Sequence, residues 1–302
     1  MVDDEVRAVF ARAGCTGALL VQPLDEDGEF GLNADQPVVP ASVVKVLVAL
    51  EAETWFAEGR LDPREPVALS AADRTPGPVG VSLFEDDAVL SWRDMVTLML
   101  TISDNPSTDA LTRRLGVDAL NTAAARLGLG NTVVRSDLRA MLDSIGESLG
   151  HAGWADLVAW SDRASAQESA RTDARLPATR ALTPGAGTRT TPRDMVTLLR
   201  LVWTDQAGPP AACARVRALM ARQLTRHRIA SAFRPPVRVA AKSGGLVGVV
   251  RNEVGVVSCP DGRRYAAAVF TRSRPGADDA AVNAAIGTAT ARAIASLHRE
   301  KT

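Results

Sequence analysis

At residues 39–50 the chain reads Val-Pro-Ala-Ser-Val-Val-Lys-Val-Leu-Val-Ala-Leu, a run that sets one serine and one lysine among closely spaced aliphatic residues. The aliphatic residues recur at intervals of three and four, which predicts a helix beginning just after Pro40. Ser42 and Lys45 are three positions apart, just under one helical turn of ~3.6 residues, so both side chains lie on one face. The start of this helix is therefore the first candidate for a reactive site.

The serine and the lysine have complementary chemistry. A serine hydroxyl is a poor nucleophile until a base removes its proton, and a desolvated lysine with a lowered pKa can be that base. The free backbone N–H groups at a helix start also suit a developing oxyanion. A Ser-x-x-Lys spacing alone is usually solvated helix surface. Here, however, the residues around Lys45 are apolar: Val43, Val44, Val46 and Leu47.

Two further short motifs follow along the chain. Ser103-Asp104-Asn105 comes at the end of a densely apolar stretch, residues 92–102, that predicts a helix. Lys242-Ser243-Gly244-Gly245 comes at the end of a predicted strand that starts near Arg238. Each motif alone is typical of an ordinary polar turn or glycine loop. The three motifs in this order, on a helix start, a helix-to-loop turn and a strand, are hard to obtain by chance.

Together these motifs resemble those of the class A serine β-lactamases and related penicillin-interacting enzymes. The flanking residues agree, with Val39-Pro40-Ala41 before the first motif, Thr101-Ile102 before the second, and Thr190-Thr191-Pro192 before a later predicted helix. The resemblance extends from about residue 5 to residue 298, with one poorly matching stretch. It implies a β-lactamase/transpeptidase-like fold of the α+β class.

The resemblance also implies roles for the residues of the first two motifs. Ser42 corresponds to the acylated nucleophile, and Lys45 to the group that accepts its proton. Ser103 corresponds to the shuttle that passes a proton to the leaving group, and Asn105 to the residue that holds the amide side chain of the substrate.

The third motif corresponds to the carboxylate side of the family's site, where Lys242 and Ser243 contact the substrate and Gly244 completes the motif. The backbone N–H of Gly245, with that of Ser42, corresponds to the oxyanion hole. Arg251 falls on the next predicted strand, where several family members place an arginine that binds the substrate carboxylate. An ordinary surface arginine on a strand is the alternative for that position.

One stretch departs from the class A pattern. In that family a loop after the helical middle supplies a glutamate that activates the water for deacylation, and in this sequence Ala140 aligns at or near that place. The neighbouring carboxylates, Asp137, Asp143 and Glu147, are not in the expected context. The acylation residues are thus complete, whereas the residue for the deacylation step is altered.

The order of predicted elements suggests one antiparallel sheet flanked by helices and an inserted helical subdomain. We expect residues 1–38 and 190–302 to form the sheet, residues 39–189 to form the helical part, and a cleft between them to hold the site. Helical spacing predicts one helix over residues 107–127 and an N-cap at Thr191, whereas residues 60–80 predict an irregular Gly/Pro-rich surface. Residues 143–187 show only weak helical signals.

Composition excludes several classes of protein. Lys plus Arg and Asp plus Glu both number 35, so the basic surplus of nucleic-acid-binding proteins is absent. No apolar run approaches the ~20 residues that span a bilayer, so no membrane partner is expected. The three cysteines have no metal-ligand spacing, so no metal site is expected, and the sequence gives no reason to expect another cofactor. The acidic start, Met1-Val2-Asp3-Asp4-Glu5, is unlike a secretory signal and predicts a cytoplasmic protein.

Three functions are compatible with these residues. The first is a serine acyl hydrolase that is acylated at Ser42 by a β-lactam or by a related small amide or ester bearing a carboxylate. The second is a cytoplasmic acyltransferase or cyclase with the same acyl-enzyme chemistry in a biosynthetic pathway. The third is a β-lactam-binding protein without turnover, although such a protein has no need of a proton shuttle.

Overall fold

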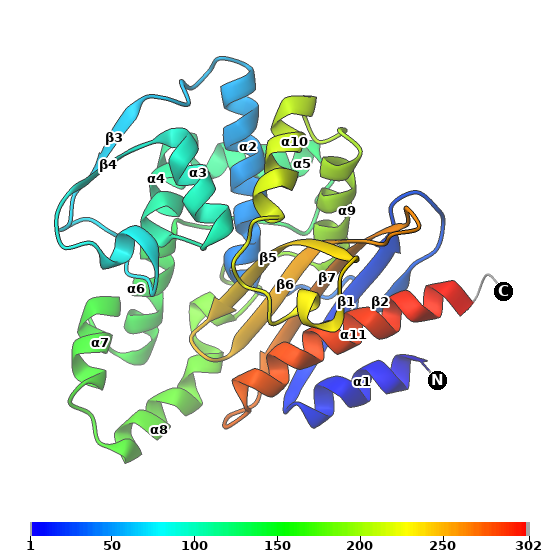
Figure 1. Cartoon of the computed structure of the whole chain (residues 1–302). Helices are drawn as coiled ribbons and strands as arrows, with labels where there is room; N and C mark the ends of the chain where they lie inside the picture. The colour runs from blue at the N-terminus through cyan, green and yellow to red at the C-terminus, as the bar shows by residue number, and fades with distance from the viewer. Residues whose placement is uncertain (1, 300–302) are drawn as a thin grey trace.

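The computed structural model describes residues 2–299, and its centre is one antiparallel sheet with helices on both faces (Figure 1). The strand order is β2-β1-β7-β6-β5, so strands from the two ends of the chain pair with each other. The strands are β1 Cys15–Pro23, β2 Phe30–Leu32, β5 Arg238–Leu246, β6 Val250–Ser258 and β7 Arg264–Ser273. The predicted α+β class, with an antiparallel sheet built from both termini, is confirmed.

Helices α1 (Val2–Arg12) and α11 (Asp279–Arg299) cover one face of the sheet (Figure 1). The contact between α1 and β1 is close, because a Cβ atom at Gly17 would lie 2.3 Å from the ring of Phe10. The central strands are apolar on both sides because both faces of the sheet are buried. In β6, for example, Val256 packs toward the other helical layer and Val257 toward α1 and α11.

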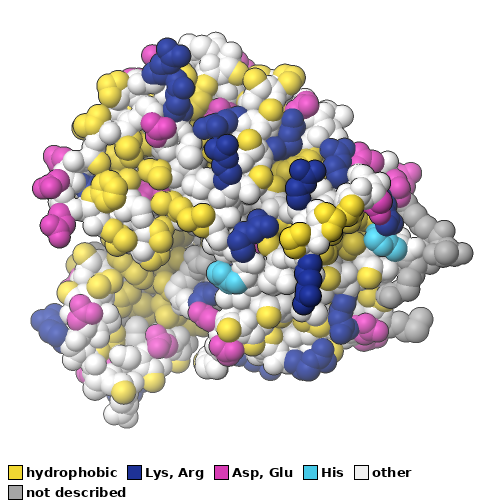
Figure 2. All heavy atoms as spheres, viewed as in Figure 1, with side chains coloured by type: hydrophobic (Ala, Val, Ile, Leu, Met, Phe, Trp, Pro, Cys, Tyr) yellow, Lys and Arg dark blue, Asp and Glu magenta, His cyan; other side chains and the backbone are white. Residues whose placement is uncertain are grey.

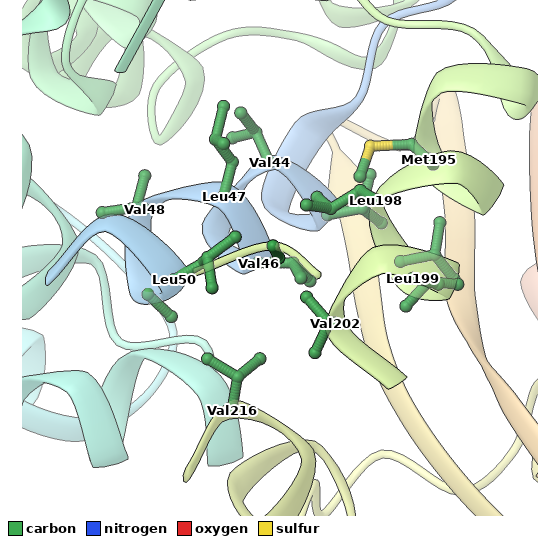
Figure 3. Packing of buried hydrophobic residues seen from close by; sticks show 14 of the residues in the cluster. Val44, Val46, Leu47, Val48, Leu50, Met195, Leu198, Leu199, Val202 and Val216 are labelled. Atoms are coloured by element: carbon green, nitrogen blue, oxygen red, sulfur yellow. The ribbon is translucent and has the colours of Figure 1, made fainter. Parts of the chain in front are cut away.

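On the other face of the sheet lie α2 (Lys45–Ala57) and α9 (Pro192–Trp203), with α10 (Pro210–Met220) beside α2. Figure 3 shows Val46 of α2 facing Leu198 and Val202 of α9, and all three side chains are fully buried. The predicted N-cap of α9 is confirmed, since the Thr191 hydroxyl accepts a hydrogen bond of 3.0 Å from the backbone N–H of Asp194. This layer fixes the helix that carries Lys45 against the sheet.

The helical part of the chain differs from the sequence prediction in two places. The helix expected over residues 107–127 is divided at Gly116, whose φ of 88° is left-handed and ends a helix. The stretch over residues 60–80 is not wholly irregular, because β3 (Pro66–Leu69) pairs with β4 (Ala88–Ser91). The helices are α3 Trp92–Thr101, α4 Asn105–Leu115, α5 Val117–Arg126, α6 Leu138–Leu149, α7 Trp154–Ser161 and α8 Ala166–Arg175.

The chain passes between its two parts at Val38 and at Thr190, which lie side by side. The N–H of Val38 donates to the carbonyl of Thr190 at 2.8 Å, and the reverse bond measures 3.0 Å. We therefore propose the division expected from the sequence, with residues 1–38 and 190–302 in the sheet part and residues 39–189 in the helical part.

Residues 143–187, which show only weak helical signals in the sequence, include residues that pack against the end of the sheet. Ile145 and Leu149 of α6 share a small apolar core with Leu246 and Val249 at the turn between β5 and β6. None of the helices within residues 2–299 combines the length and the apolar character needed to cross a membrane.

One buried carboxylate on α2 gives a stability prediction. Glu53 is 9% exposed, and its Oε1 atom lies 3.8 Å from the Nε atom of Arg215, beyond hydrogen-bond distance. Burial raises the pKa of Glu53 from 4.5 to about 7, against the opposing effect of Arg215. The folded state therefore retains a proton that the unfolded state loses, and stability falls as pH rises from about 4.5 to about 7.

Glu53→Gln should thus raise the free energy of unfolding at pH 8, by up to about 3 kcal/mol, with the gain shrinking toward pH 5. Urea unfolding at both pH values measures the difference, and Glu58→Gln, at the exposed end of the same helix, is the matched control. A loss of stability in Glu53→Gln at pH 8 would show that its ion pair with Arg215 outweighs the cost of burial.

Candidate active site

Ser42 lies in a single 3-10 turn, η1 (Ala41–Val44), that leads directly into α2. The backbone N–H of Lys45 donates to the carbonyl of Ser42, which keeps the two residues on one helical turn. The residue before the serine is strained, because Ala41 has a φ of 48°, a left-handed value that alanine rarely adopts. Such strain is concentrated at functional sites, where the surrounding structure holds it in place.

Lys45 is fully buried, and its amine is held by the second motif. Its Nζ atom lies 2.7 Å from the carbonyl oxygen of Ser103, 3.1 Å from the Ser103 hydroxyl and 3.0 Å from Oδ1 of Asn105. Burial lowers the pKa of Lys45 to about 7, although the negative charges of Asp104 and Asp109 oppose this shift. A lysine with this pKa exists in both protonation states near neutral pH, as a general base requires.

The second motif is fixed by hydrogen bonds at the start of α4. Asp104 caps this helix by accepting from the N–H of Ser107 at 2.8 Å, and it also accepts from the N–H of Val81 at 2.7 Å. Nδ2 of Asn105 donates to the carbonyl of Pro76 at 2.8 Å. Ser103 itself has a φ of 67°, the second strained residue of the site. The loop over residues 76–81 therefore holds Ser103 and Asn105 toward Lys45.

The third motif lies within β5 and brings the strand against the turn that carries Ser42. A Cβ atom at Gly244 would lie 2.9 Å from the carbonyl oxygen of Pro40 and 3.1 Å from the backbone nitrogen of Ser42, so this close approach requires a glycine. Gly245, the next residue, is exposed, and Ser243 is half-buried. The structure thus brings the backbone of β5 beside the backbone of Ser42.

Lys242 is the second fully buried lysine of the site. Its Nζ atom donates to the carbonyl of Ser243 at 2.8 Å. Burial lowers its pKa well below the usual value, and the nearby charge of Lys45 acts in the same direction, while Glu253 opposes it. All three motifs therefore meet at one place, with two buried amines beside two partly exposed hydroxyl groups, those of Ser42 and Ser103.

Arg251 lies on β6 directly opposite Gly245, and its guanidinium forms an ion pair with Asp279 at the start of α11. A second arginine, Arg228, also lies beside Gly245. Its Nη1 atom donates to the carbonyls of Gly244 at 2.7 Å and of Asn252 at 2.6 Å. Arg228 and Arg251 approach to 3.9 Å and 4.0 Å, respectively, of the position that a Cβ atom on Gly245 would occupy.

Arg228 is a site residue that the sequence prediction missed. It is 7% exposed, and burial lowers its pKa to about 10, with Glu253 opposing the shift. In the sequence it stands in the polar run Arg226-His227-Arg228, which is typical of an exposed loop. Nothing in that pattern distinguishes the one buried guanidinium from its exposed neighbour.

The stretch that the sequence aligned with the family's glutamate lies at the start of α6. Ala140 is exposed, and it lines a pocket of about 360 Å³ together with Asp143 and Glu147. Leu138, two residues earlier, instead lines a narrow pocket together with Pro40 and Ala41, the two residues before Ser42. Leu138, but not Ala140, therefore lines a pocket together with the turn that carries Ser42.

Asp109 on α4 holds the start of α6 in place, because it accepts from the backbone N–H groups of Leu138 at 2.7 Å and of Arg139 at 2.9 Å. Asp137, the nearest carboxylate along the chain, is engaged elsewhere, because it caps α6 at Ala140 and pairs with Arg113 at 2.7 Å. Over residues 2–299 no group of three His, Cys, Asp or Glu side chains is placed to hold a metal ion.

Residues 1–297 match the model of the β-lactamase enzyme family. A β-lactamase regulatory protein of Streptomyces cacaoi is 30% identical over 286 residues, which cover 91% of this chain and 90% of that protein. Among solved structures, a β-lactamase from Sphaerobacter thermophilus superimposes with a TM-score of 0.78 at 24% identity, covering 99% of this chain and 97% of that one. A variant of PBP-A, in an acyl-enzyme complex with penicillin G, superimposes with a TM-score of 0.76 at 21% identity, covering 99% and 96%.

Proposed function

Because the chain belongs to the β-lactamase enzyme family, we propose that it is a serine acyl hydrolase, acylated at Ser42 by a β-lactam or by a related amide or ester. The observation that carries this proposal is the environment of Lys45. Its buried amine, with a pKa of about 7, lies one turn after Ser42 and 3.1 Å from the hydroxyl of Ser103. This arrangement joins a base, a nucleophile and a second hydroxyl in one site.

In the proposed acylation, Oγ of Ser42 attacks the carbonyl carbon of the substrate while Lys45 accepts the hydroxyl proton. The carbonyl oxygen becomes an oxyanion, which the backbone N–H groups of Ser42 and Gly245 stabilise. When the bond to the leaving nitrogen or oxygen breaks, Ser103 donates its proton to the leaving atom and recovers one from Lys45. The products are an acyl-serine ester and a protonated leaving group, and Lys45 is neutral again.

The remaining residues are proposed to bind the substrate. Asn105 is assigned the amide side chain of the acyl group. Lys242 and Ser243, with the glycine backbone of Gly244, are assigned the carboxylate. The buried Arg228 adds positive charge beside Gly245, where Arg251 also lies although it is paired with Asp279, and this supports a substrate with a carboxylate at that end.

Incubation with benzylpenicillin followed by intact-mass measurement tests the proposal. We expect a mass increase equal to one whole penicillin molecule per chain, since a β-lactam ring opens without losing atoms. A chromogenic β-lactam then reports whether the adduct is hydrolysed. A chain that neither gains mass nor turns over either compound would not be a β-lactam-reactive enzyme.

A second candidate is an acyltransferase or cyclase that passes the acyl group to an amine, and the surroundings of Leu138 favour it. The pocket beside Ala41 is lined mainly by apolar side chains, and Asp137, the carboxylate at its edge, is already bound to Arg113. An acyl-serine without a positioned base reacts slowly with water. The third candidate, a β-lactam-binding protein without turnover, is supported by the regulatory role named for the Streptomyces cacaoi relative.

The position beside the nucleophile can be tested by adding a carboxylate. Leu138→Glu should speed deacylation of the penicillin adduct by at least ~10-fold, because a general base typically contributes that much or more. Ala140→Glu is the matched control, and its carboxylate should have little effect because that side chain lies in the other pocket. The half-life of the adduct, followed by mass spectrometry, distinguishes them. Faster deacylation in Ala140→Glu alone would place the reactive water near α6's exposed side instead.

A further inference from the structure

One acidic side chain lies buried among the basic residues beside the site. Between Asp205 and Asp261 the sequence contains nine Lys and Arg residues and a single acidic residue, Glu253. Figure 2 shows Lys and Arg side chains gathered on the middle of the face that carries α10 and the segment leading to β5. Glu253 itself is fully buried, on β6 directly opposite Ser243 of the third motif. A buried carboxylate is costly unless hydrogen bonds satisfy its oxygens, so its partners show what it holds in place.

Both carboxylate oxygens of Glu253 accept hydrogen bonds from one segment of the chain, residues 223–229. Oε2 accepts from the backbone N–H of Ile229 at 2.6 Å, and Oε1 accepts from Nε2 of Gln223 at 3.1 Å. Burial raises the pKa of Glu253, whereas these two hydrogen bonds and the charge of Arg228 oppose the shift, as partners of an ionised carboxylate do. Glu253 thus fastens both ends of this segment to β6.

The first end of the segment reaches the third motif through Gln223, which is itself buried. Its Nε2 group donates to Glu253 and to the carbonyl of Thr225 at 3.0 Å, and neither of these groups can donate in return. The amide oxygen of Gln223 therefore faces the backbone N–H of Ser243, from which it accepts a hydrogen bond. Because β5 is the edge strand of the sheet, this side chain takes the place of a neighbouring strand at Ser243.

The other end of the segment carries Arg228, which immediately precedes Ile229. Its Nη1 atom donates to the carbonyl of Gly244 at 2.7 Å, and its Nε atom donates to Oδ1 of Asn283 on α11 at 2.8 Å. Both acceptors are neutral groups, and the charge of Glu253 opposes the fall in the pKa of Arg228 that burial causes. One carboxylate therefore supports the third motif from both ends of the segment.

We propose that Glu253 and Gln223 are positioning residues that form a hydrogen-bond relay, which holds Ser243 and Arg228 where the carboxylate of the substrate binds. This inference rests on the proposed function and adds two residues that do not themselves touch the substrate. The relay depends on the number of acceptors. Glu253 presents two oxygens to two N–H donors, whereas a glutamine there would present one oxygen and one amino group, so either Gln223 or Ile229 would face a donor.

Glu253→Gln tests the relay when acylation by benzylpenicillin is compared with acylation by its methyl ester, which lacks the charged carboxylate. We expect the second-order rate constant for benzylpenicillin to fall by at least ~10-fold, the effect of losing one hydrogen bond to a charged group, and that for the ester to change by no more than a few-fold. A purely structural defect would slow both compounds alike, and equal losses would overturn the proposal.

Glu51→Gln is the matched control for a buried carboxylate. Glu51 is also buried, but it lies on α2 and accepts from Nε1 of Trp55 on its own helix at 2.7 Å. Its neutralisation should leave the ratio of the two rate constants unchanged. If Glu253→Gln does not fold, Gln223→Met removes the link to Ser243 while the carboxylate of Glu253 stays in place, and the same selective loss for benzylpenicillin is expected.

The exchanged pair Glu253→Gln/Gln223→Glu provides a rescue. The glutamate at position 223 can accept both from the N–H of Ser243 and from the amino group of the new glutamine, whose oxygen can accept from Ile229. Most of the lost rate with benzylpenicillin should therefore return. A double variant that is slower than Glu253→Gln would show that the two side chains do not act as one relay.

Hydrogen–deuterium exchange of the backbone N–H groups of Ser243 and Ile229, followed by NMR, tests the relay without any substrate. At least one of the two should exchange faster in Glu253→Gln than in the wild-type chain, and exchange should be slow again in the double variant. Unchanged exchange at both positions would overturn the proposal. If benzylpenicillin fails to acylate the wild-type chain, the proposed function fails, whereas the exchange rates still decide whether the relay exists.

Discussion

Ser42→Ala abolishes covalent labelling by penicillins and by phosphonate probes, which is the largest effect we expect of any single substitution. The reason is geometric. Ser42 shares a helical turn with Lys45, and its backbone nitrogen lies 3.1 Å from where a Cβ atom at Gly244 would stand, so the proposed nucleophile, base and oxyanion donors are brought together at this residue. Removing one hydroxyl eliminates the bond-forming atom and leaves the packing around it intact.

Intact-mass spectra after incubation with excess benzylpenicillin measure this effect, and thermal unfolding confirms that the variant is folded. Ser136→Ala is the matched control: its hydroxyl is bonded to the carbonyl of Asp137 and lies beside the same turn, without a lysine at hand. The control should label fully. A stoichiometric adduct in Ser42→Ala, located on another residue by peptide mapping, would transfer the role of nucleophile to that residue.

Local patterns predicted much of the fold because each depends on neighbours along the chain. The aliphatic spacing after Pro40 predicted a helix there, and the turn of η1 with α2 now carries Ser42 and Lys45. The polar residues before α9 predicted its N-cap at Thr191. By contrast, the break at Gly116 was missed, since one glycine within an Ala- and Leu-rich pattern does not decide between one helix and two.

The order of the three motifs suggested one site, but its contacts could not be predicted from spacing. The bond from Lys45 to Ser103 joins residues 58 positions apart, and it depends on how α2 packs against α3 and α4. Arg228 and Gln223 were missed because a buried polar residue and a solvated one look alike in sequence. Their partners, the carbonyl of Gly244 and the N–H of Ser243, are backbone groups that carry no signal in the sequence.

The alignment at α6 illustrates the same limit. Sequence alignment placed Ala140 at or near the position of the family's glutamate. In the structure, Asp109 accepts from the N–H groups of Leu138 and Arg139, and Leu138 lines the same pocket as Ala41. Residues two positions apart on a helix point in different directions, so counting along the chain does not show which of them lies on the side of Ser42.

Lys45→Met should lower the rate of acylation by at least ~10²-fold, the scale of a lost general base. Methionine retains most of the buried volume of lysine, so the effect reports on the amine rather than on a cavity. Thermal unfolding provides the check on folding. Acylation within a few-fold of wild type would remove Lys45 from the mechanism and require another base for Ser42.

The pH dependence of acylation separates the proposed role from a purely structural one. The active form of a base is the neutral one, and burial lowers the pKa of Lys45 to about 7. The acylation rate of the wild-type chain should therefore rise with pH and level off above about 7, because the fraction of neutral amine increases until it is complete. The negative charge of Asp104 raises this pKa, so Asp104→Asn should move the midpoint of the pH profile to lower pH.

In Lys45→Met the rise of the acylation rate with pH should vanish. A wild-type profile that stays flat from about pH 5 to about pH 9 would mean that Lys45 does not titrate in the rate-limiting step, and a rise that persists in Lys45→Met would assign it to another group, such as Lys242.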